Sequence, residues 1–113
     1  MASATPLISD FKKRLQRAQP CLGAWLTAPS PQVADAMVSL GFHWLGLELE
    51  HALFSEETAA HCITVGMAAQ LPTFARLPEA DPLLARRLLD YGCAGVIVPG
   101  TQSAEEFAAF AAR

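Results

Sequence analysis

The sequence predicts an α/β fold in which a leading helix is followed by four strand–helix units. Short apolar runs recur four times, each is followed by a segment with helical spacing, and Ser or Asp marks the helix starts. Alternation of this kind implies a parallel sheet with right-handed crossover connections. Four units make either a small open sheet or half of an eight-fold barrel, and the count leaves that choice open.

The predicted strands are apolar runs that end at turn residues or at charge. The leading helix is expected over residues 7–18, and the strands over 21–26, 42–49, 71–75 and 94–98. The first and last of these runs are continuously apolar, a pattern typical of strands that are covered on both faces.

Helix boundaries are predicted from capping residues. Ser and Asp side chains accept hydrogen bonds from free N–H groups in the first turn, and Pro is tolerated at the first helical position. Ser103 with Glu106 three residues later forms a capping box. The expected starts are Ser30-Pro31, Ser55, Asp81-Pro82 and Ser103, and the expected C-terminal glycines are Gly41 and Gly92.

Length and charge restrict the class of protein. The chain has 113 residues, with 11 acidic and 8 basic side chains and a formal charge of -3, so we expect one domain or part of one. Because the charges are scattered, a nucleic-acid partner is not expected. The one basic group, Lys12, Lys13, Arg14 and Arg17, is interpreted as a solvated helix face.

The cysteines and the amino terminus indicate a reducing compartment. Cys21, Cys62 and Cys93 are far apart and lie among apolar neighbours, which favours buried free thiols over disulfides or a structural zinc site. Residues 1–6 lack the pattern of a signal peptide, and no apolar run approaches membrane-spanning length. We therefore expect a cytoplasmic protein with no membrane contact.

Polar side chains follow the ends of the predicted strands. In a parallel sheet these carboxyl ends form one rim, where catalytic side chains are held by the strands and stay open to solvent. Arg can grip a carboxylate in a bidentate fork, and His can move a proton at neutral pH. The rim therefore suits a small anionic substrate. Its candidate residues are Trp25, Glu48, Glu50, His51, Arg76 and Gln102.

Several of these residues have a structural alternative. Arg76 is equally suited to a loop ion pair with Glu79 or Asp81. Asp90 is expected on a helix surface, with orientation of an imidazole as its alternative role. His43 and His61 are interpreted as structural or solvent-facing.

Residues 42–52, FHWLGLELEHA, resemble the second-strand signature of the HpcH/HpaI aldolase family, in which a hydrophobic strand with Trp ends in Asp-x-Glu-His-Ala. The order of the other segments is also similar to that family and covers nearly the whole chain. These segments are 23–26, 75–78 with Asp81-Pro82, 88–92, 95–99 and 102–106.

The resemblance implies the amino-terminal half of a (β/α)8 TIM barrel, with residues 1–113 as a single partial domain. The family consists of class II, metal-dependent aldolases that cleave 4-hydroxy-2-oxo acids into pyruvate and an aldehyde. By this resemblance His51 is the acid/base residue, supported by Asp90, and Arg76 holds the pyruvate moiety. Trp25 and Gln102 are then substrate-binding candidates, with Glu48 and Glu50 behind them as supporting residues.

Two departures from the family pattern limit this expectation. Glu48 and Leu49 stand where the family has Asp and a small residue. The family's ligands for a divalent metal, Mg²⁺, Mn²⁺ or Co²⁺, come from later strands, and no residue here matches them. We therefore expect little or no aldolase activity from this chain alone. The partner is expected to be a small oxo-acid substrate, and the chain either forms a homo-oligomer or lacks a carboxyl-terminal half.

Two other readings remain open from the residues. One is a non-catalytic half-barrel that associates with itself. The other is a small open-sheet domain that binds a carboxylate ligand. A half-barrel leaves two bare strand edges that must pair with something, and this requirement separates the first reading from the second.

Overall fold

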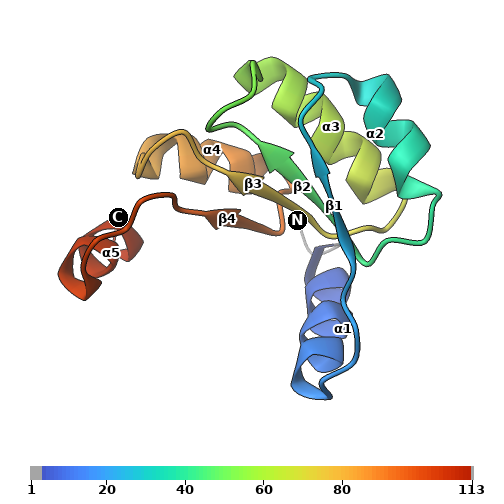
Figure 1. Cartoon of the computed structure of the whole chain (residues 1–113), viewed down its shortest axis with the longest axis horizontal. Helices are drawn as coiled ribbons and strands as arrows, with labels where there is room; N and C mark the ends of the chain where they lie inside the picture. The colour runs from blue at the N-terminus through green and yellow to red at the C-terminus, as the bar shows by residue number, and fades with distance from the viewer. Residues whose placement is uncertain (1–3, 113) are drawn as a thin grey trace.

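The computed structural model describes residues 4–112 and the side chains from Ile8 to Ala112, in the predicted α/β order (Figure 1). Residues 1–3, Arg113 and the side chain of Leu7, which the predictions included, lie outside the described part. The elements are α1 (Ala4–Gln16), β1 (Gly23–Leu26), α2 (Pro31–Val38), β2 (Trp44–Glu48), α3 (Glu56–Ala68), β3 (Thr73–Arg76), α4 (Pro82–Tyr91), β4 (Gly95–Ile97) and α5 (Ala104–Ala111).

The four strands form one parallel sheet in the order β1-β2-β3-β4, which confirms the predicted topology. Each strand therefore pairs with the next along the chain, and each connection between strands contains a helix. Strands β1 and β4 are the two edges of the sheet formed by the described residues.

All four predicted helix starts are confirmed. The caps accept hydrogen bonds as expected: Ser30 from the N–H of Val33, Ser55 from Thr58, Asp81 from Leu83 and Leu84, and Ser103 from Glu106. Gly92 ends α4 in the left-handed region with φ 115°, also as predicted. The prediction for Gly41 is wrong: α2 ends at Val38 with Ser39 as its cap, and Gly41, with φ 89°, lies in the following loop.

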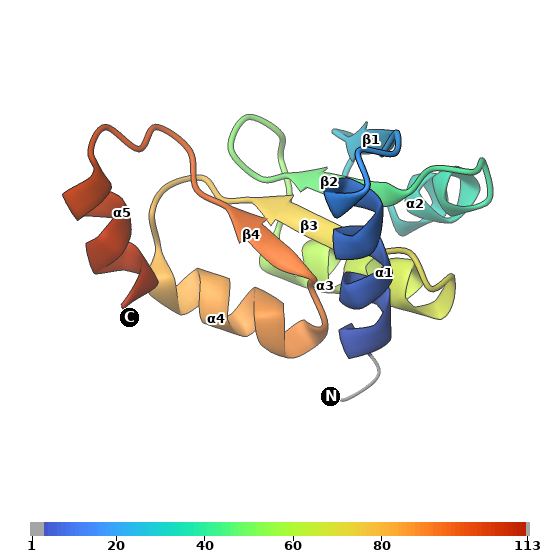
Figure 2. The same ribbon diagram turned by 90° about the horizontal axis from the view of Figure 1, so that it is seen from below.

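One face of the sheet, called the outer face, is covered by α2, α3 and α4 (Figures 1 and 2). Alternate strand residues point to this face and are buried, as the two-residue period of a strand requires. They form the core with the apolar stripes of the helices. Its fully buried members are Leu26, Ala34, Leu45, Leu47, Ala59, Cys62, Ile63, Ala75, Leu77 and Leu88.

The opposite, inner face carries Trp25, Trp44, Phe74 and Ile97. Helix α1 reaches it only near the amino ends of the strands, where the Phe11 and Phe74 ring centroids are 5.4 Å apart. A hollow of about 380 Å³ remains, lined in part by Phe11, Trp44, Phe74 and Ile97. The prediction that β1 and β4 are covered on both faces is therefore wrong for the described residues: Trp25 is 43% exposed and Ile97 is 37% exposed.

Glycines make room for the aromatic rings on the inner face. A Cβ added to Gly23 would lie 1.8 Å from the Trp44 ring, and one added to Gly46 would lie 2.7 Å from the Trp25 ring. Each ring therefore lies across a glycine of the neighbouring strand, because β1 and β2 are directly paired. The ring of Trp25 also meets that of Trp44 edge to face, with centroids 5.7 Å apart.

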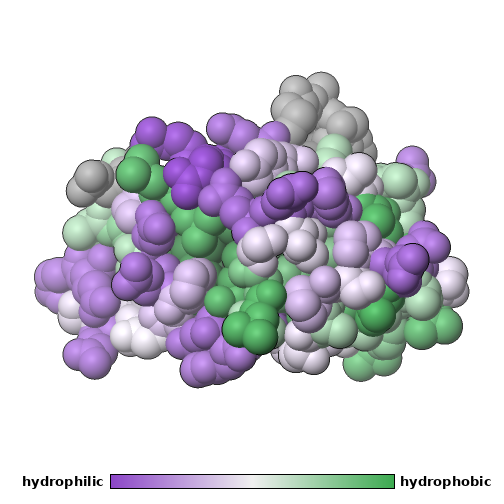
Figure 3. All heavy atoms as spheres, turned by 90° about the horizontal axis from the view of Figure 1, so that it is seen from above, coloured by the Kyte–Doolittle hydropathy of each residue, from purple (hydrophilic) through white to green (hydrophobic). Residues whose placement is uncertain are grey.

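Seen from the side of α2 and α3, the surface mixes hydrophilic residues with smaller hydrophobic groups (Figure 3). Such a mixture is ordinary for a solvated helical layer, since single exposed apolar residues need no partner. Among the described residues, no helix combines the length and the apolar character that crossing a membrane requires.

Candidate functional site

The candidate site is built on two neighbouring strand ends. Glu48 is the last residue of β2, Arg76 is the last residue of β3, and the two are paired in register. Side chains of register partners point to the same face of a sheet and lie side by side. Here that face is the inner one, and the strand geometry alone brings the carboxylate and the guanidinium together.

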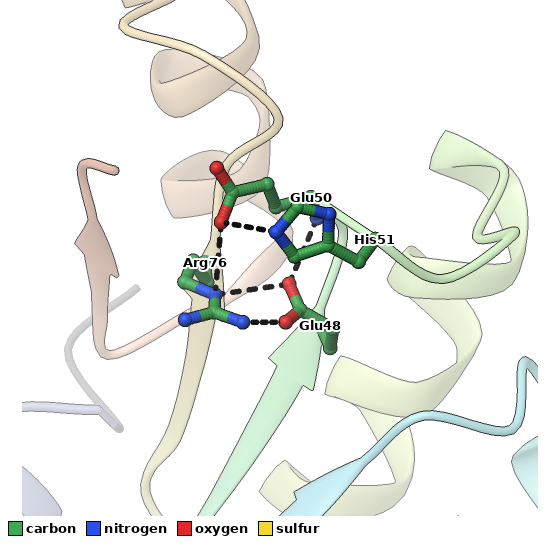
Figure 4. Close-up of polar contacts among 4 residues, drawn as sticks. All are labelled: Glu48, Glu50, His51 and Arg76. Atoms are coloured by element: carbon green, nitrogen blue, oxygen red, sulfur yellow. Dashed lines mark hydrogen bonds and ion pairs between the residues drawn. The ribbon is translucent and has the colours of Figure 1, made fainter. Parts of the chain in front are cut away.

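Arg76 grips Glu48 in a bidentate fork (Figure 4). Its Nε donates to Oε1 of Glu48 at 3.0 Å, and its Nη2 donates to Oε2. The side chain of Glu48 is only 7% exposed and that of Arg76 is 34% exposed. A carboxylate this deeply buried needs a matched cation, so the pair is part of the fold as well as of the rim.

The alternative that paired Arg76 with Glu79 or Asp81 is wrong. The partner of Arg76 is Glu48, and Asp81 instead caps α4. The sequence contained one signal for this pair, because Glu48 and Arg76 each stand at the end of an apolar strand. With the alternation of side chains along each strand, both point to the inner face. Finding the pair required the register between β2 and β3, which the spacing of residues does not give.

Glu50 connects Arg76 with His51. Its Oε1 lies 3.5 Å from Nε of Arg76 and 3.3 Å from Nε2 of His51, and its own N–H donates to Oε1 of Glu48 at 2.9 Å. Figure 4 shows the carboxylates of Glu48 and Glu50 directed at the guanidinium, with the imidazole of His51 beside Glu50. The His51 side chain is 74% exposed, so its imidazole is accessible from solvent. The predicted convergence of imidazole, carboxylates and guanidinium is therefore present.

Trp25 completes one wall of this cluster. The guanidinium carbon of Arg76 lies 5.3 Å from the centroid of the Trp25 ring, within the range of a cation–π contact. The indole comes from β1, so three adjacent strands contribute to the surroundings of Arg76.

Other predicted residues lie apart from the cluster. Asp90 is exposed in the last turn of α4, before the amino end of β4, whereas His51 follows the carboxyl end of β2. Gln102 is exposed in the loop after β4, and its N–H donates to Glu106 at 3.0 Å. His43 has a structural contact, since its Nδ1 accepts the N–H of Leu22 at 2.9 Å, and His61 is exposed on α3.

The three cysteines are free thiols, but only two are buried. Cys62 and Cys93 lie in the interior, while Cys21 is half-buried, which corrects the prediction for that residue. Burial raises the pKa of Cys62, and it raises the pKa of Cys93 to about 11. Cys93 is thus a protonated structural thiol at neutral pH.

The described residues do not present a metal site. Within residues 4–112 no group of three or more His, Cys, Asp or Glu side chains is placed to hold an ion. Both oxygens of Glu48, the most buried carboxylate of the cluster, are engaged by Arg76. The donor set of the described residues therefore does not fit a resident divalent metal by itself.

The fold matches solved aldolase structures. A HpcH/HpaI aldolase/citrate lyase family protein from Burkholderia cenocepacia superposes with a TM-score of 0.78 at 30% identity, over 89% of this chain and 40% of that protein. An HpcH/HpaI aldolase from Desulfitobacterium hafniense superposes with a TM-score of 0.76 at 29% identity, over 85% and 38%. The sheet and helices described above are thus the first half of a TIM-barrel fold.

Curated relatives show that the chain is also similar to aldolases in amino-acid sequence. A hydroxypyruvate/pyruvate aldolase of Paraburkholderia phytofirmans is 31% identical over 102 residues, and a 4-hydroxy-2-oxovalerate aldolase of Rhodococcus jostii is 30% identical over 103 residues. These matches cover 88% and 90% of this chain but only 39% and 40% of the relatives. No protein-family model matches the sequence. The individual matches in sequence and in fold nevertheless place this chain in the HpcH/HpaI aldolase family, where it corresponds to the amino-terminal half of the barrel.

Proposed function

We propose that this chain carries the proton-transfer and carboxylate-binding groups of a carbon–carbon lyase, within a single partial domain. The reaction is the retro-aldol cleavage of a 4-hydroxy-2-oxo acid to pyruvate and an aldehyde. The observation that carries the proposal is the junction of His51 and Arg76 through one carboxylate oxygen of Glu50, at 3.3 and 3.5 Å. The names of the two curated relatives support the substrate class.

The chemistry assigns one task to each of these two groups. The exposed imidazole of His51 takes the proton from the 4-hydroxyl, the bond between C3 and C4 breaks, and its electron pair passes into the enolate of pyruvate. Arg76 binds the carboxylate of the oxo acid and places positive charge near the developing enolate oxygen. Proton return to the enolate carbon then gives pyruvate.

The divalent metal of the family is not accommodated by the described residues, so no step is assigned to it here. Arg76 is already matched by Glu48, which leaves the enolate with little electrostatic stabilisation from this chain, and that stabilisation is often the largest part of catalysis. We therefore propose that efficient cleavage requires groups beyond those in residues 4–112.

The proposal is tested on the 113-residue protein in two steps. Pyruvate binding is measured first, and Arg76→Lys is expected to weaken it, because Lys keeps the charge but lacks the fork. Arg76→Ala is avoided, since it would leave Glu48 buried without a cation. If the Arg76→Lys variant binds pyruvate as well as the parent protein does, the guanidinium of Arg76 is not used as proposed.

Cleavage is measured second, with Mg²⁺ or Mn²⁺ and a 4-hydroxy-2-oxo acid. We expect little or no release of pyruvate. Release at a rate that His51→Ala abolishes would show that the chain is a complete catalyst, contrary to the proposal.

The exposed inner face favours a second candidate function, a half-barrel that associates with its own copies or with a carboxyl-terminal half. Trp25 and Ile97 are exposed there, and in the sheet formed by residues 4–112 the outer edges of β1 and β4 are unpaired. Light scattering coupled to size exclusion tests it, since a stable monomer would exclude self-association. Pyruvate binding by a stable monomer that EDTA leaves unchanged fits a small carboxylate-binding domain and the proposed Arg76 site alike, whereas a site completed by a metal would lose affinity in EDTA.

A further inference from the structure

We propose that Glu48 and Trp25 are positioning residues, which hold Arg76 so that one edge of its guanidinium is presented to the substrate carboxylate. The inference rests on the proposed function and adds to it the way the carboxylate binds. It concerns residues that do not touch the reacting atoms and act only through Arg76.

Glu48 fixes the guanidinium within its own plane. The fork occupies Nε and Nη2, and two parallel hydrogen bonds define the direction of a planar group more strictly than one does. In Figure 4 the third nitrogen, Nη1, points away from Glu48, Glu50 and His51. The edge between Nη1 and Nη2 is therefore the part of Arg76 that remains for a second carboxylate.

Trp25 fixes the tilt of that plane. Its ring lies 5.3 Å from the guanidinium carbon and is itself held by Trp44, 5.7 Å away between ring centroids. The ring can lie there because β2 has glycine at position 46, where a Cβ would come within 2.7 Å of it. The sequence Trp44-Leu45-Gly46 thus supplies both a support and a space for Trp25.

Burial makes this pair different from a surface ion pair. The chain contains a second fork with the same geometry, from Arg87 to Glu56 at 2.7 and 3.0 Å, but there the side chains are 50% and 33% exposed. Exposed pairs hold their geometry weakly, because water competes for both partners. Because Glu48 is only 7% exposed, water competes little for its carboxylate, and Arg76 therefore keeps one orientation.

The test compares Glu48→Gln with Glu56→Gln in the ¹⁵N-labelled 113-residue protein. Gln keeps the shape of Glu but removes the charge and one of the two acceptors, so it breaks either fork without opening a cavity. Pyruvate is the probe, and the ¹H–¹⁵N signals of the Arg76 Nε–H and the Trp25 indole N–H are followed during the titration. Glu48→Asp, which keeps the charge, is the second variant in case the Glu48→Gln protein folds poorly.

We expect Glu48→Gln to weaken pyruvate binding roughly tenfold or more, because a misplaced binding group loses most of its contribution. The Arg76 Nε–H signal should also weaken through faster exchange with water, without pyruvate present. Glu48→Asp should bind pyruvate better than Glu48→Gln, and Glu56→Gln should bind it like the parent protein.

The outcomes separate this inference from the proposed function. If Arg76→Lys weakens pyruvate binding but Glu48→Gln leaves both binding and the Arg76 signal unchanged, the positioning role is wrong and the carboxylate site stands. Tighter binding by Glu48→Gln would show that Glu48 competes with the substrate, which also overturns the inference. If the parent protein binds no pyruvate, the proposed carboxylate site fails, and the inference fails with it.

Discussion

The two faces of the sheet are made by the same four strands, yet they differ in what covers them. On the outer face Leu26, Leu45 and Leu47 are fully buried under helices. On the inner face Trp25 and Ile97 remain exposed, and the ion pair of buried Glu48 with half-buried Arg76 lies at the strand ends. The difference indicates that most of the stability comes from the helical side, while the carboxylate binding and proton transfer proposed above use the other side.

Substitutions of buried residues on the outer face are therefore expected to cause the largest loss of stability. Leu45→Ala removes a fully buried side chain from the middle of β2 and should lower the free energy of unfolding by about 2–5 kcal/mol. Ile97→Thr is the matched change on the inner face, where we expect a loss below about 1 kcal/mol. Urea unfolding measures both. Equal losses would mean that the inner face is also covered in solution, as self-association would require.

The second-largest expected effect is a loss of stability at high pH, which is caused by ionisation of the buried Cys93 thiol. Burial raises its pKa from 9.0 to about 11, so the folded protein favours the protonated thiol. Its stabilising contribution is present below pH 9 and is lost as the pH rises through 11, by about 3 kcal/mol. Unfolding of the parent protein and of Cys93→Ala is compared between pH 8 and 11. If the difference between them does not change with pH, Cys93 is not the titrating group.

Local signals in the sequence predicted the helices well. Ser30, Ser55, Asp81 and Ser103 all cap helices as expected, because a cap depends on a few neighbouring residues only. The exception, Gly41, shows the limit of the rule: a glycine suited to the left-handed region can serve the loop instead of the helix end.

Burial on two faces could not be predicted from hydropathy. Residues 94–98 are as apolar as a strand covered on both sides, but apolar character does not say which element provides the cover. Within the described residues, α2, α3 and α4 cover the outer face of the sheet, whereas Ile97 on the inner face remains exposed.

The candidate site was predicted as a set of residues but not as a set of contacts. The rim placed His51, Glu50 and Arg76 together because parallel strands end on the same side. The pairing of Arg76 with Glu48 depends on register, which is a long-range property of the sheet. Asp90 was linked to an imidazole as an alternative to a helix-surface role and to His51 by the resemblance, but within one chain Asp90 lies before the amino end of β4 and His51 follows the carboxyl end of β2.

The smallest expected effect comes from the outer pair of Glu56 and Arg87. Hydrogen bonds from Arg87, and then from Tyr91, hold the pKa of Glu56 below its ordinary value of 4.5. A lowered pKa means that the pair stabilises the fold above pH 4.5 and ceases to do so as the pH falls through the pKa of the folded state. Because the side chain of Arg87 is half exposed and that of Glu56 one-third exposed, solvent and salt screen the interaction.

Thermal unfolding of Glu56→Gln should therefore show a slightly lower Tm than the parent at pH 7, and the difference should vanish in acid and shrink in high salt. Glu57→Gln is the control, since Glu57 shares the first turn of α3 and has the same position relative to the helix dipole. An equal effect of both changes would assign it to the dipole rather than to Arg87. A large, salt-independent effect of Glu56→Gln alone would mean that the pair of Glu56 and Arg87 is held as firmly as the pair of Glu48 and Arg76. The difference in exposure between the two pairs would then not explain why Arg76 keeps one orientation.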